Sequence, residues 1–141
     1  MGRNSNQRPL SEKVLVCITP QSNSRRLINH GHRIAGKVSG ELHILHVEKG
    51  SNLFTRSDTS VTLQELFDYG SELGGVVHAV CGEDIPQTIY EFVREEKITG
   101  IVLGEPPEDA PQASGSVIEQ LNLMMPFLKI EVLKRNQAAD D

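Results

Sequence analysis

The sequence has no tryptophan and few aromatic residues, with four Phe and two Tyr in 141 residues. Proteins that bind single-stranded nucleic acid stack the bases on aromatic side chains, and this chain has few to offer. It also lacks an excess of positive charge, because 14 Lys and Arg stand against 19 Asp and Glu and give a net charge of −5. A protein that binds nucleic acid through its phosphates carries a basic surface instead. We therefore expect no nucleic-acid partner.

Cysteines and long apolar runs are equally scarce. The two cysteines, Cys17 and Cys81, form no C-x-x-C pair, which suits a reducing cytoplasm better than a disulfide scaffold. No apolar run approaches the ~20 residues that a membrane-spanning helix needs. Residues 1–10 are polar and lack the apolar stretch of a signal peptide. We expect a cytoplasmic protein with no membrane insertion.

What the sequence does contain is a regular alternation of short apolar runs and amphipathic segments. The runs have the β-branched composition of buried strands and span residues 13–18, 42–47, 76–80, 98–103 and 127–133. The segments between them have the apolar spacing of helices. Such alternation predicts an α/β fold, a Rossmann-like three-layer sandwich with a five-stranded parallel sheet. We expect one domain at residues 12–133 between polar tails at 1–11 and 134–141.

Three of the expected helices have recognisable start signals. Thr62 and Ser116 each stand three residues before a glutamate, which is the spacing of a capping box. Asp84 precedes Pro86, and proline is tolerated in the first turn of a helix. We therefore expect these helices to begin at Thr62, Asp84 and Ser116.

The first strand–helix junction is the more anion-friendly of two candidate sites. In a doubly wound sheet the ligand lies outside the carboxyl ends of the strands, where the strand order reverses. This junction offers the hydroxyls of Thr19, Ser22 and Ser24, a helix N-terminus, and the cations Arg25 and Arg26. The alternative is that Ser22 or Ser24 caps the helix and the two arginines are solvated or paired with acidic groups.

The second candidate is the loop 104–116. Gly104, Gly115 and Ser116 suit a loop that holds a phosphate through backbone N–H groups. However, three prolines in this loop have no N–H to donate, and three carboxylates repel an anion. The residues are Pro106, Pro107, Pro111, Glu105, Glu108 and Asp109. We therefore favour a stiff acidic surface loop in which Ser116 is only an N-cap.

The histidines and cysteines do not predict a metal site or a catalytic centre. His30 and His32 are two apart on a helix and point in different directions. His43 and His46 are three apart on a strand and face opposite sides of the sheet. No P-loop, G-x-G-x-x-G or G-x-S-x-G motif occurs. We assign no catalytic residue and no metal ligand, and we interpret both cysteines as core residues.

Particular residues in this layout resemble the universal stress protein family, and most of all the stress-protein-like domain of KdpD-type osmosensitive potassium sensor kinases. The resemblance covers about residues 12–133, nearly the whole of the predicted domain. The supporting segments are Lys13-Val-Leu-Val-Cys17, Ser22-Asn-Ser24-Arg-Arg-Leu-Ile28, Glu41-Leu-His-Ile-Leu-His-Val-Glu48, Glu72-Leu-Gly-Gly-Val-Val77, Gly82-Glu-Asp-Ile85, Glu91-Phe-Val-Arg94 and Ile98-Thr-Gly-Ile-Val-Leu-Gly104.

The resemblance implies a sheet in the order 3-2-1-4-5 and a nucleotide site at its carboxyl edge. In ATP-binding members, adenine and ribose lie over the end of the first strand and the phosphates lie on a glycine-rich loop. Some KdpD-type domains are receptors for cyclic di-AMP, and Ser22 and Ser24 resemble part of that site. The resemblance therefore implies ATP, AMP or cyclic di-AMP as ligand at Thr19, Pro20, Ser22, Ser24, Arg25, Val47, Gly104, Gly115 and Ser116.

The resemblance also implies a homodimer formed through the last strand. That strand is then an edge strand, and an unpaired apolar edge invites strand addition. The candidate contact residues are Phe127, Leu128, Ile130 and Val132.

The sequence departs from the ATP-binding pattern at two positions. Pro107 stands where the loop's middle glycine is expected, and Thr19 stands in place of an acidic residue. Our hypothesis is a non-catalytic signalling module in a stress or potassium/osmotic response, which acts by dimerisation and protein contact. A small nucleotide is its candidate ligand, and a sensor kinase or transporter is its candidate partner. The alternatives are an ATP-binding, weakly hydrolytic stress protein, a cyclic di-AMP receptor, and a regulatory domain of a larger kinase or transporter.

Overall fold

The computed structural model describes residues 12–19, 24–50, 57–105 and 112–134. Strands and helices alternate through these ranges, as the apolar runs predicted. The elements are β1 (Lys13–Cys17), α2 (Arg25–Lys37), β2 (Glu41–Lys49), α3 (Ser57–Glu72), β3 (Val76–Gly82), α4 (Ile85–Glu96), β4 (Gly100–Gly104), α5 (Gln112–Met124) and β5 (Lys129–Leu133). Of the predicted tails 1–11 and 134–141, the structure describes only residue 134, so the domain boundaries stay a prediction. Within the described ranges, no helix is long and apolar enough to span a membrane.

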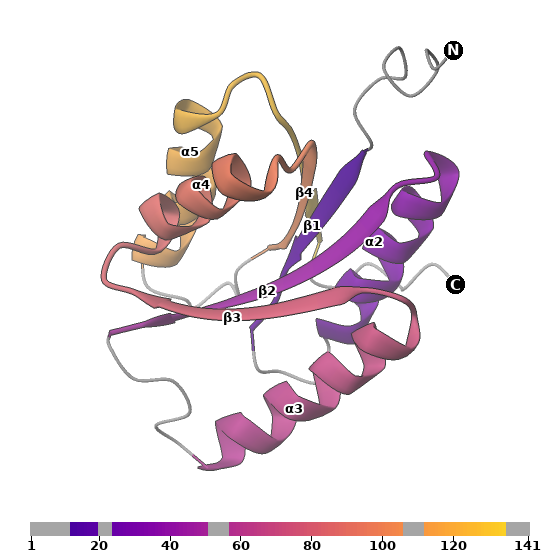
Figure 1. Cartoon of the computed structure of the whole chain (residues 1–141). Helices are drawn as coiled ribbons and strands as arrows, with labels where there is room; N and C mark the ends of the chain where they lie inside the picture. The colour runs from indigo at the N-terminus through magenta and orange to yellow at the C-terminus, as the bar shows by residue number, and fades with distance from the viewer. Residues whose placement is uncertain (1–11, 20–23, 51–56, 106–111, 135–141) are drawn as a thin grey trace, which may run out of the picture.

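The five strands form one parallel sheet in the order β3-β2-β1-β4-β5 (Figure 1). β1 lies at the centre, where Val14 is in register with Leu42 of β2 on one side and Gly100 of β4 on the other. Along the chain, β2 and β3 are added on one side of β1, and the chain then returns to add β4 and β5 on the other side. This confirms the predicted α/β fold and strand order, and it puts the reversal of strand order between β1 and β4.

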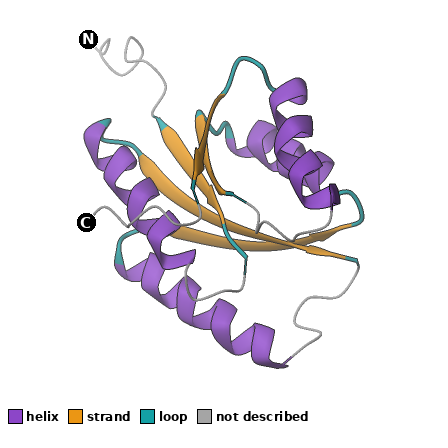
Figure 2. Cartoon of the chain, turned by 180° about the vertical axis from the view of Figure 1, so that it is seen from behind, coloured by secondary structure: helices purple, strands orange, loops and turns teal. Residues whose placement is uncertain are grey.

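Helices cover both faces of the sheet, so the molecule has three layers (Figures 1 and 2). α2 and α3 pack on one face, where Val14 and Val16 of β1 contribute to the core. α4 and α5 pack on the other face, where Leu15 contributes. Successive side chains of a strand point to opposite faces, so a strand covered on both sides needs a continuous apolar run. The run at residues 13–18 meets that need.

Two of the three predicted helix starts are wrong. α3 begins at Ser57 and α5 begins at Gln112, so Thr62 and Ser116 lie inside helices. A Ser or Thr three residues before a Glu also places the two residues on one face within a helix, so the motif alone does not mark a start. Helix α5 begins at Gln112, directly after Pro111. No proline lies between Gln112 and Ser116, so nothing of that kind stops the helix from including these residues.

The third helix start is confirmed. The side chain of Asp84 accepts a hydrogen bond from the backbone N–H of Gln87 at 3.1 Å, and Pro86 lies in the first turn. The helix ends at Lys97, whose φ of 59° is left-handed. A residue in that conformation is a common helix stop.

Candidate functional site

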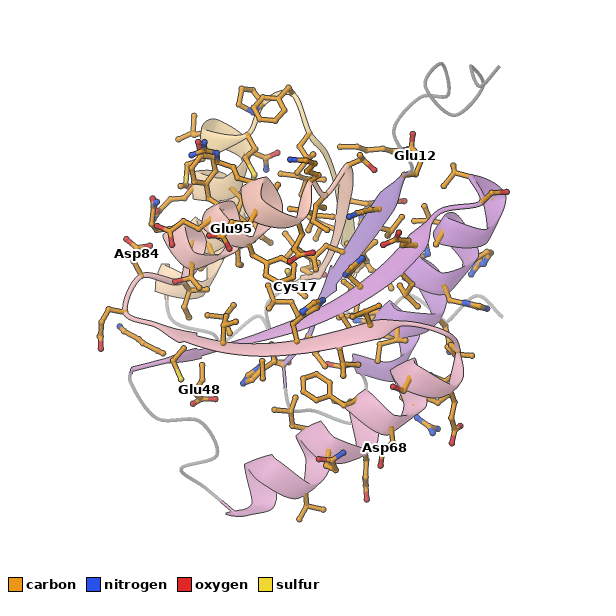
Figure 3. All side chains as sticks on the ribbon, viewed as in Figure 1. Glu12, Cys17, Glu48, Asp68, Asp84 and Glu95 are labelled. Carbon is orange, nitrogen blue, oxygen red and sulfur yellow. The ribbon has the colours of Figure 1, made fainter. Side chains whose placement is uncertain are left out.

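The reversal of strand order puts the candidate site at the carboxyl ends of β1 and β4. Glu12, before β1, and Glu48, near the end of β2, mark the two ends of the sheet (Figure 3). At the carboxyl end, the N–H of Ile18 donates to the carbonyl of Leu45 at 2.9 Å, so β1 and β2 stay joined up to that point. Thr19 follows and is exposed. Pro20 and Ser22, two of the predicted site residues, lie outside the described residues.

Ser24 closes the connection between β1 and α2. Its hydroxyl donates to the carbonyl of Thr19 at 2.8 Å, and the residue is only 2% exposed. Ser24 stands at the N-cap position of α2, but its side chain makes no capping hydrogen bond. Of the two candidate capping residues, Ser22 lies outside the described residues, and Ser24 does not cap the helix because its hydroxyl donates to the preceding segment.

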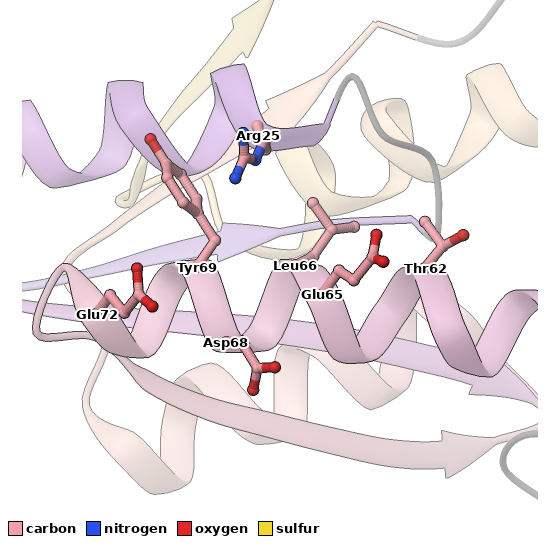
Figure 4. Close-up of a pocket in the computed structure, with 7 residues that line it drawn as sticks. All are labelled: Arg25, Thr62, Glu65, Leu66, Asp68, Tyr69 and Glu72. Atoms are coloured by element: carbon pink, nitrogen blue, oxygen red, sulfur yellow. The ribbon is translucent and has the colours of Figure 1, made fainter.

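The two arginines of this junction have internal partners. The guanidinium of Arg25 lies over the ring of Tyr69 on α3, 4.2 Å from the ring centroid (Figure 4). This is a cation–π contact. Arg26 donates through Nη1 to the carbonyl of Lys134 at 2.8 Å. Both cations thus tie α2 to neighbouring segments.

A hollow of about 450 Å³ lies beside Arg25, between α2 and α3 (Figure 4). Three carboxylates and one guanidinium line it, so its charge disfavours an anion. The hydroxyl of Tyr69 donates to Asn29 of α2, which fixes the ring. The sequence interpretation missed this hollow, although the three- and four-residue spacing of its α3 residues was a signal that they share one face. The lining residues are Arg25, Thr62, Glu65, Leu66, Asp68, Tyr69 and Glu72.

The second candidate loop is only partly described. Gly104 ends β4, and a Cβ there would lie 3.2 Å from Cδ1 of Leu27, so the glycine gives α2 room to approach. The N–H of Glu105 donates to the carbonyl of Leu133 at 3.0 Å. Residues 106–111, with the three prolines, lie outside the described residues. Gly115 and Ser116 lie inside α5, so the prediction that Ser116 is an N-cap is wrong.

The end of β2 contributes Val47 and His46, on opposite faces. Val47 packs against the core under α4 and α5. His46 is 4% exposed, with Nδ1 3.3 Å from the carbonyl oxygen of Ile18 and Nε2 2.8 Å from Oε1 of Glu48. His46 therefore links the ends of β1 and β2 beneath the candidate site, a role that the sequence interpretation did not assign.

Cys17 has no exposed, reactive thiol. Burial raises the pKa of its thiol to about 12, which keeps it protonated at neutral pH. The residue packs against the core under α4 and α5 (Figure 3). Across the described ranges, no group of three His, Cys, Asp or Glu side chains is placed to hold a metal ion.

The predicted dimer residues divide into two groups. β5 begins at Lys129, so Phe127 and Leu128 precede the strand. Leu128 and Ile130 pack against the core under α4 and α5. Phe127 and Val132 are 77% and 37% exposed. Leu123 of α5, which the sequence interpretation did not include, is 79% exposed.

No family model matches the chain. The sensor protein KdpD of Mycobacterium tuberculosis (strain H37Rv) is 34% identical over 93 residues, which are 66% of this chain and 11% of that protein. A KdpD sensor protein of Synechocystis sp. is 26% identical over 131 residues, which are 92% of this chain and 35% of that protein. The chain thus spans about a tenth of the first relative and about a third of the second.

Solved universal stress proteins have the same fold. One from Archaeoglobus fulgidus has a TM-score of 0.67 and 17% identity, over 87% of this chain and 93% of that one. A universal stress protein in complex with cAMP has a TM-score of 0.64 and 15% identity, over 89% and 98% of the two chains. The Archaeoglobus fulgidus protein in complex with dAMP has a TM-score of 0.58 and 16% identity, over 89% and 97%. The predicted resemblance is confirmed: the chain has the fold of solved universal stress proteins, and its sequence is similar to that of KdpD sensor proteins.

Proposed function

We propose that the chain is a non-catalytic signalling module that pairs with a second copy and contacts a partner protein such as a sensor kinase or transporter. The carrying observation is a set of exposed apolar side chains on the end of α5, on β5 and on the segment that joins them. Leu123, Phe127 and Val132 are 79%, 77% and 37% exposed. Large exposed apolar residues of this kind commonly belong to interaction surfaces. The similarity to KdpD sensor proteins supports a role in a stress or potassium/osmotic response.

The position of β5 supports pairing with a second copy. β5 has β4 as its neighbour on one side and stands at the end of the five-stranded order. An edge strand offers unpaired N–H and C=O groups to another chain. Phe127 and Val132 would then contact their counterparts across a two-fold axis, as in other symmetric dimers.

The proposal that the chain is non-catalytic rests on the contacts that the polar side chains of the β1–α2 junction already make within the chain. The hydroxyl of Ser24 hydrogen bonds to Thr19, Arg25 stacks on Tyr69, and Arg26 binds a backbone carbonyl. A catalytic group needs a side chain that meets the substrate with a suitable protonation state. These contacts favour a structural role for the junction.

Sedimentation velocity at micromolar concentration tests the pairing. We expect the unmodified chain to sediment as a dimer and the Phe127→Glu variant as a monomer, because the new carboxylates would be buried together. Val61→Glu is the matched control, since Val61 is an exposed valine on α3, 58% exposed and outside this segment. A monomeric unmodified chain, or a dimer of Phe127→Glu, would contradict the proposal.

A second candidate function is the binding of a nucleoside monophosphate at the β1–α2 junction. Two of the similar structures hold cAMP and dAMP, which each carry one phosphate group. The acidic loop 104–116 of this chain opposes the larger charge of a triphosphate. We therefore expect AMP or cAMP to bind more tightly than ATP, with cyclic di-AMP, which carries two phosphates, as the remaining alternative.

Isothermal titration calorimetry with AMP, cAMP, ATP and cyclic di-AMP separates these ligands. Thr19→Glu puts a negative charge at the end of β1 and is expected to abolish binding of a monophosphate. Val38→Glu adds the same charge at the opposite end of α2, where the residue is 45% exposed, and is expected to leave binding unchanged. Tighter binding of ATP than of AMP would favour the ATP-binding stress protein instead.

A further inference from the structure

Three titratable side chains form a chain of hydrogen bonds near the amino ends of β2 and β3, at the other end of the sheet from the candidate site. Nε2 of His43 lies 2.9 Å from Oε1 of Glu41. Nδ1 of His43 lies 3.0 Å from Nε2 of His78. Glu41 is the first residue of β2, and His43 and His78 are each third in their strands. No function described above uses this cluster.

Helix α4 covers the cluster. His43 is 4% exposed and alternates along β2 with Leu45 and Val47, which face α4 and α5. The rings of His43 and His78 are nearly parallel, with an interplanar angle of 13°. The rings of His78 and Phe92 on α4 form a T-shaped pair, with centroids 4.7 Å apart and an interplanar angle of 72°. His78 is therefore the point where α4 touches the hydrogen-bonded pair.

The number of protons that the pair can hold follows from the hydrogen bonds. A carboxylate only accepts, so His43 donates to Glu41 through Nε2–H and turns Nδ1 toward His78. Only one hydrogen fits between two nitrogens 3.0 Å apart. The pair can take one further proton on the outer nitrogen of His78. A second additional proton would place a hydrogen on both Nδ1 of His43 and Nε2 of His78, and the hydrogen bond between these two nitrogens would be lost.

The charges around the pair oppose protonation of His78 on balance. Burial and the neighbouring His43 lower the pKa of His78, while Glu96 at the end of α4 acts in the opposite direction. The hydrogen bond from His43, with Lys13 of β1, lowers the pKa of Glu41, which keeps its carboxylate ionised as an acceptor. Helix α3 packs on the other face of the sheet.

We propose that Glu41, His43 and His78 form a pH-responsive contact that fastens α4 to the edge of the sheet at neutral pH and loosens it in mild acid. The ligand is the proton, since no metal-binding group of three side chains occurs among the described residues. Protonation places a charge on a partly buried ring between β3 and α4, beside His43, where the neutral form is favoured. α4 leads directly into β4, so a shift of α4 acts on the strand that borders the candidate site.

Nuclear magnetic resonance titration of the unmodified full chain tests this contact. We expect the ring of His78 to titrate below 6.5, the ordinary pKa of histidine. We also expect the ring resonances of Phe92 to move with the same midpoint as those of His78, because the two rings are in contact.

Two variants sharpen the test. His43→Gln removes a neighbour that disfavours the charged form of His78, so the midpoint of His78 is expected to rise toward the ordinary pKa of histidine, 6.5. His32→Gln, at an exposed position on α2, is the matched control and is expected to leave His78 and Phe92 unchanged. If His78 titrates at or above 6.5 in the unmodified chain, or if Phe92 does not follow His78, the proposal is overturned. The titration of His78 and Phe92 in the unmodified chain tests the proposal even if a variant fails to fold.

Discussion

Substitution by alanine is expected to have opposite effects on the free energy of unfolding at two glycines of helix α2, Gly31 and Gly36. Gly31 is buried against β1, and a Cβ placed there would lie 2.2 Å from Cγ2 of Val16 and 3.3 Å from Cδ1 of Leu42. Val16 is fully buried, so its methyl group has little room to move. Gly36 lies one turn later in the same helix, and a Cβ there would meet nothing within 4 Å. The two positions therefore separate the effect of packing from the effect of helix propensity.

The expected magnitudes follow from these distances. Alanine is more favourable than glycine inside a helix by about 1 kcal/mol, and by less near the helix end. Gly36→Ala should therefore raise the free energy of unfolding by about 0.5–1 kcal/mol. Overpacking of a core costs about 1–3 kcal/mol, which outweighs the propensity gain. We expect Gly31→Ala to lower the free energy of unfolding by about 1–2 kcal/mol.

Urea unfolding followed by circular dichroism measures both changes. The double variant Val16→Ala with Gly31→Ala removes the methyl group that the new Cβ would strike. We expect its loss of stability to be smaller than the sum of the two single losses by about 1 kcal/mol or more, as for residues in direct contact. The reasoning is refuted if Gly31→Ala stabilises the chain as Gly36→Ala does, or if the losses simply add.

Three further outcomes are expected. Asp84→Ala should lower the free energy of unfolding by about 1 kcal/mol in the same assay, because the N–H of Gln87 loses its capping partner. Stability should fall as the pH drops below about 6.5, the ordinary pKa of histidine, because burial lowers the pKa of His78 in the folded state and the unfolded chain then binds more protons. Thermal melts at a series of pH values should show a smaller fall for His78→Gln. Mass spectrometry should find Cys17 unmodified by iodoacetamide at neutral pH until urea unfolds the chain, since burial raises its thiol pKa to about 12.

The strands themselves were predictable because their cause is local in the sequence, whereas their order came from the family resemblance. A strand buried on both faces needs an apolar run, as at residues 14–18 and 101–103. Helix starts were harder. The start at Asp84 was identified from Pro86, since proline inside a helix is confined to its first turn. Thr62 and Ser116 belong to motifs that also occur inside helices, so they did not mark a start.

The candidate site was less predictable because its contacts join distant residues. Arg25 appeared as a free cation at a helix N-terminus, but its partner Tyr69 lies on another helix. His43 and His78 meet only because β2 and β3 are neighbours, with His78 in register with Leu45. Sequence spacing on one element cannot show such pairs. The prediction that His43 and His46 face opposite sides is confirmed, since it depends on a single strand.

Helix α2 connects the two surfaces on which the proposed function rests. It begins at the β1–α2 junction and contacts β5 and the residue that follows it. Nε2 of His30 lies 3.2 Å from Oε2 of Glu131 in β5, and Arg26 donates to the carbonyl of Lys134 at 2.8 Å. A second copy that adds to β5 would thus act on the same helix whose N-terminus borders the proposed nucleotide site. Coupling between two binding sites is reciprocal, so a nucleotide that shifts α2 must change the dimer affinity by the same factor as pairing changes nucleotide affinity.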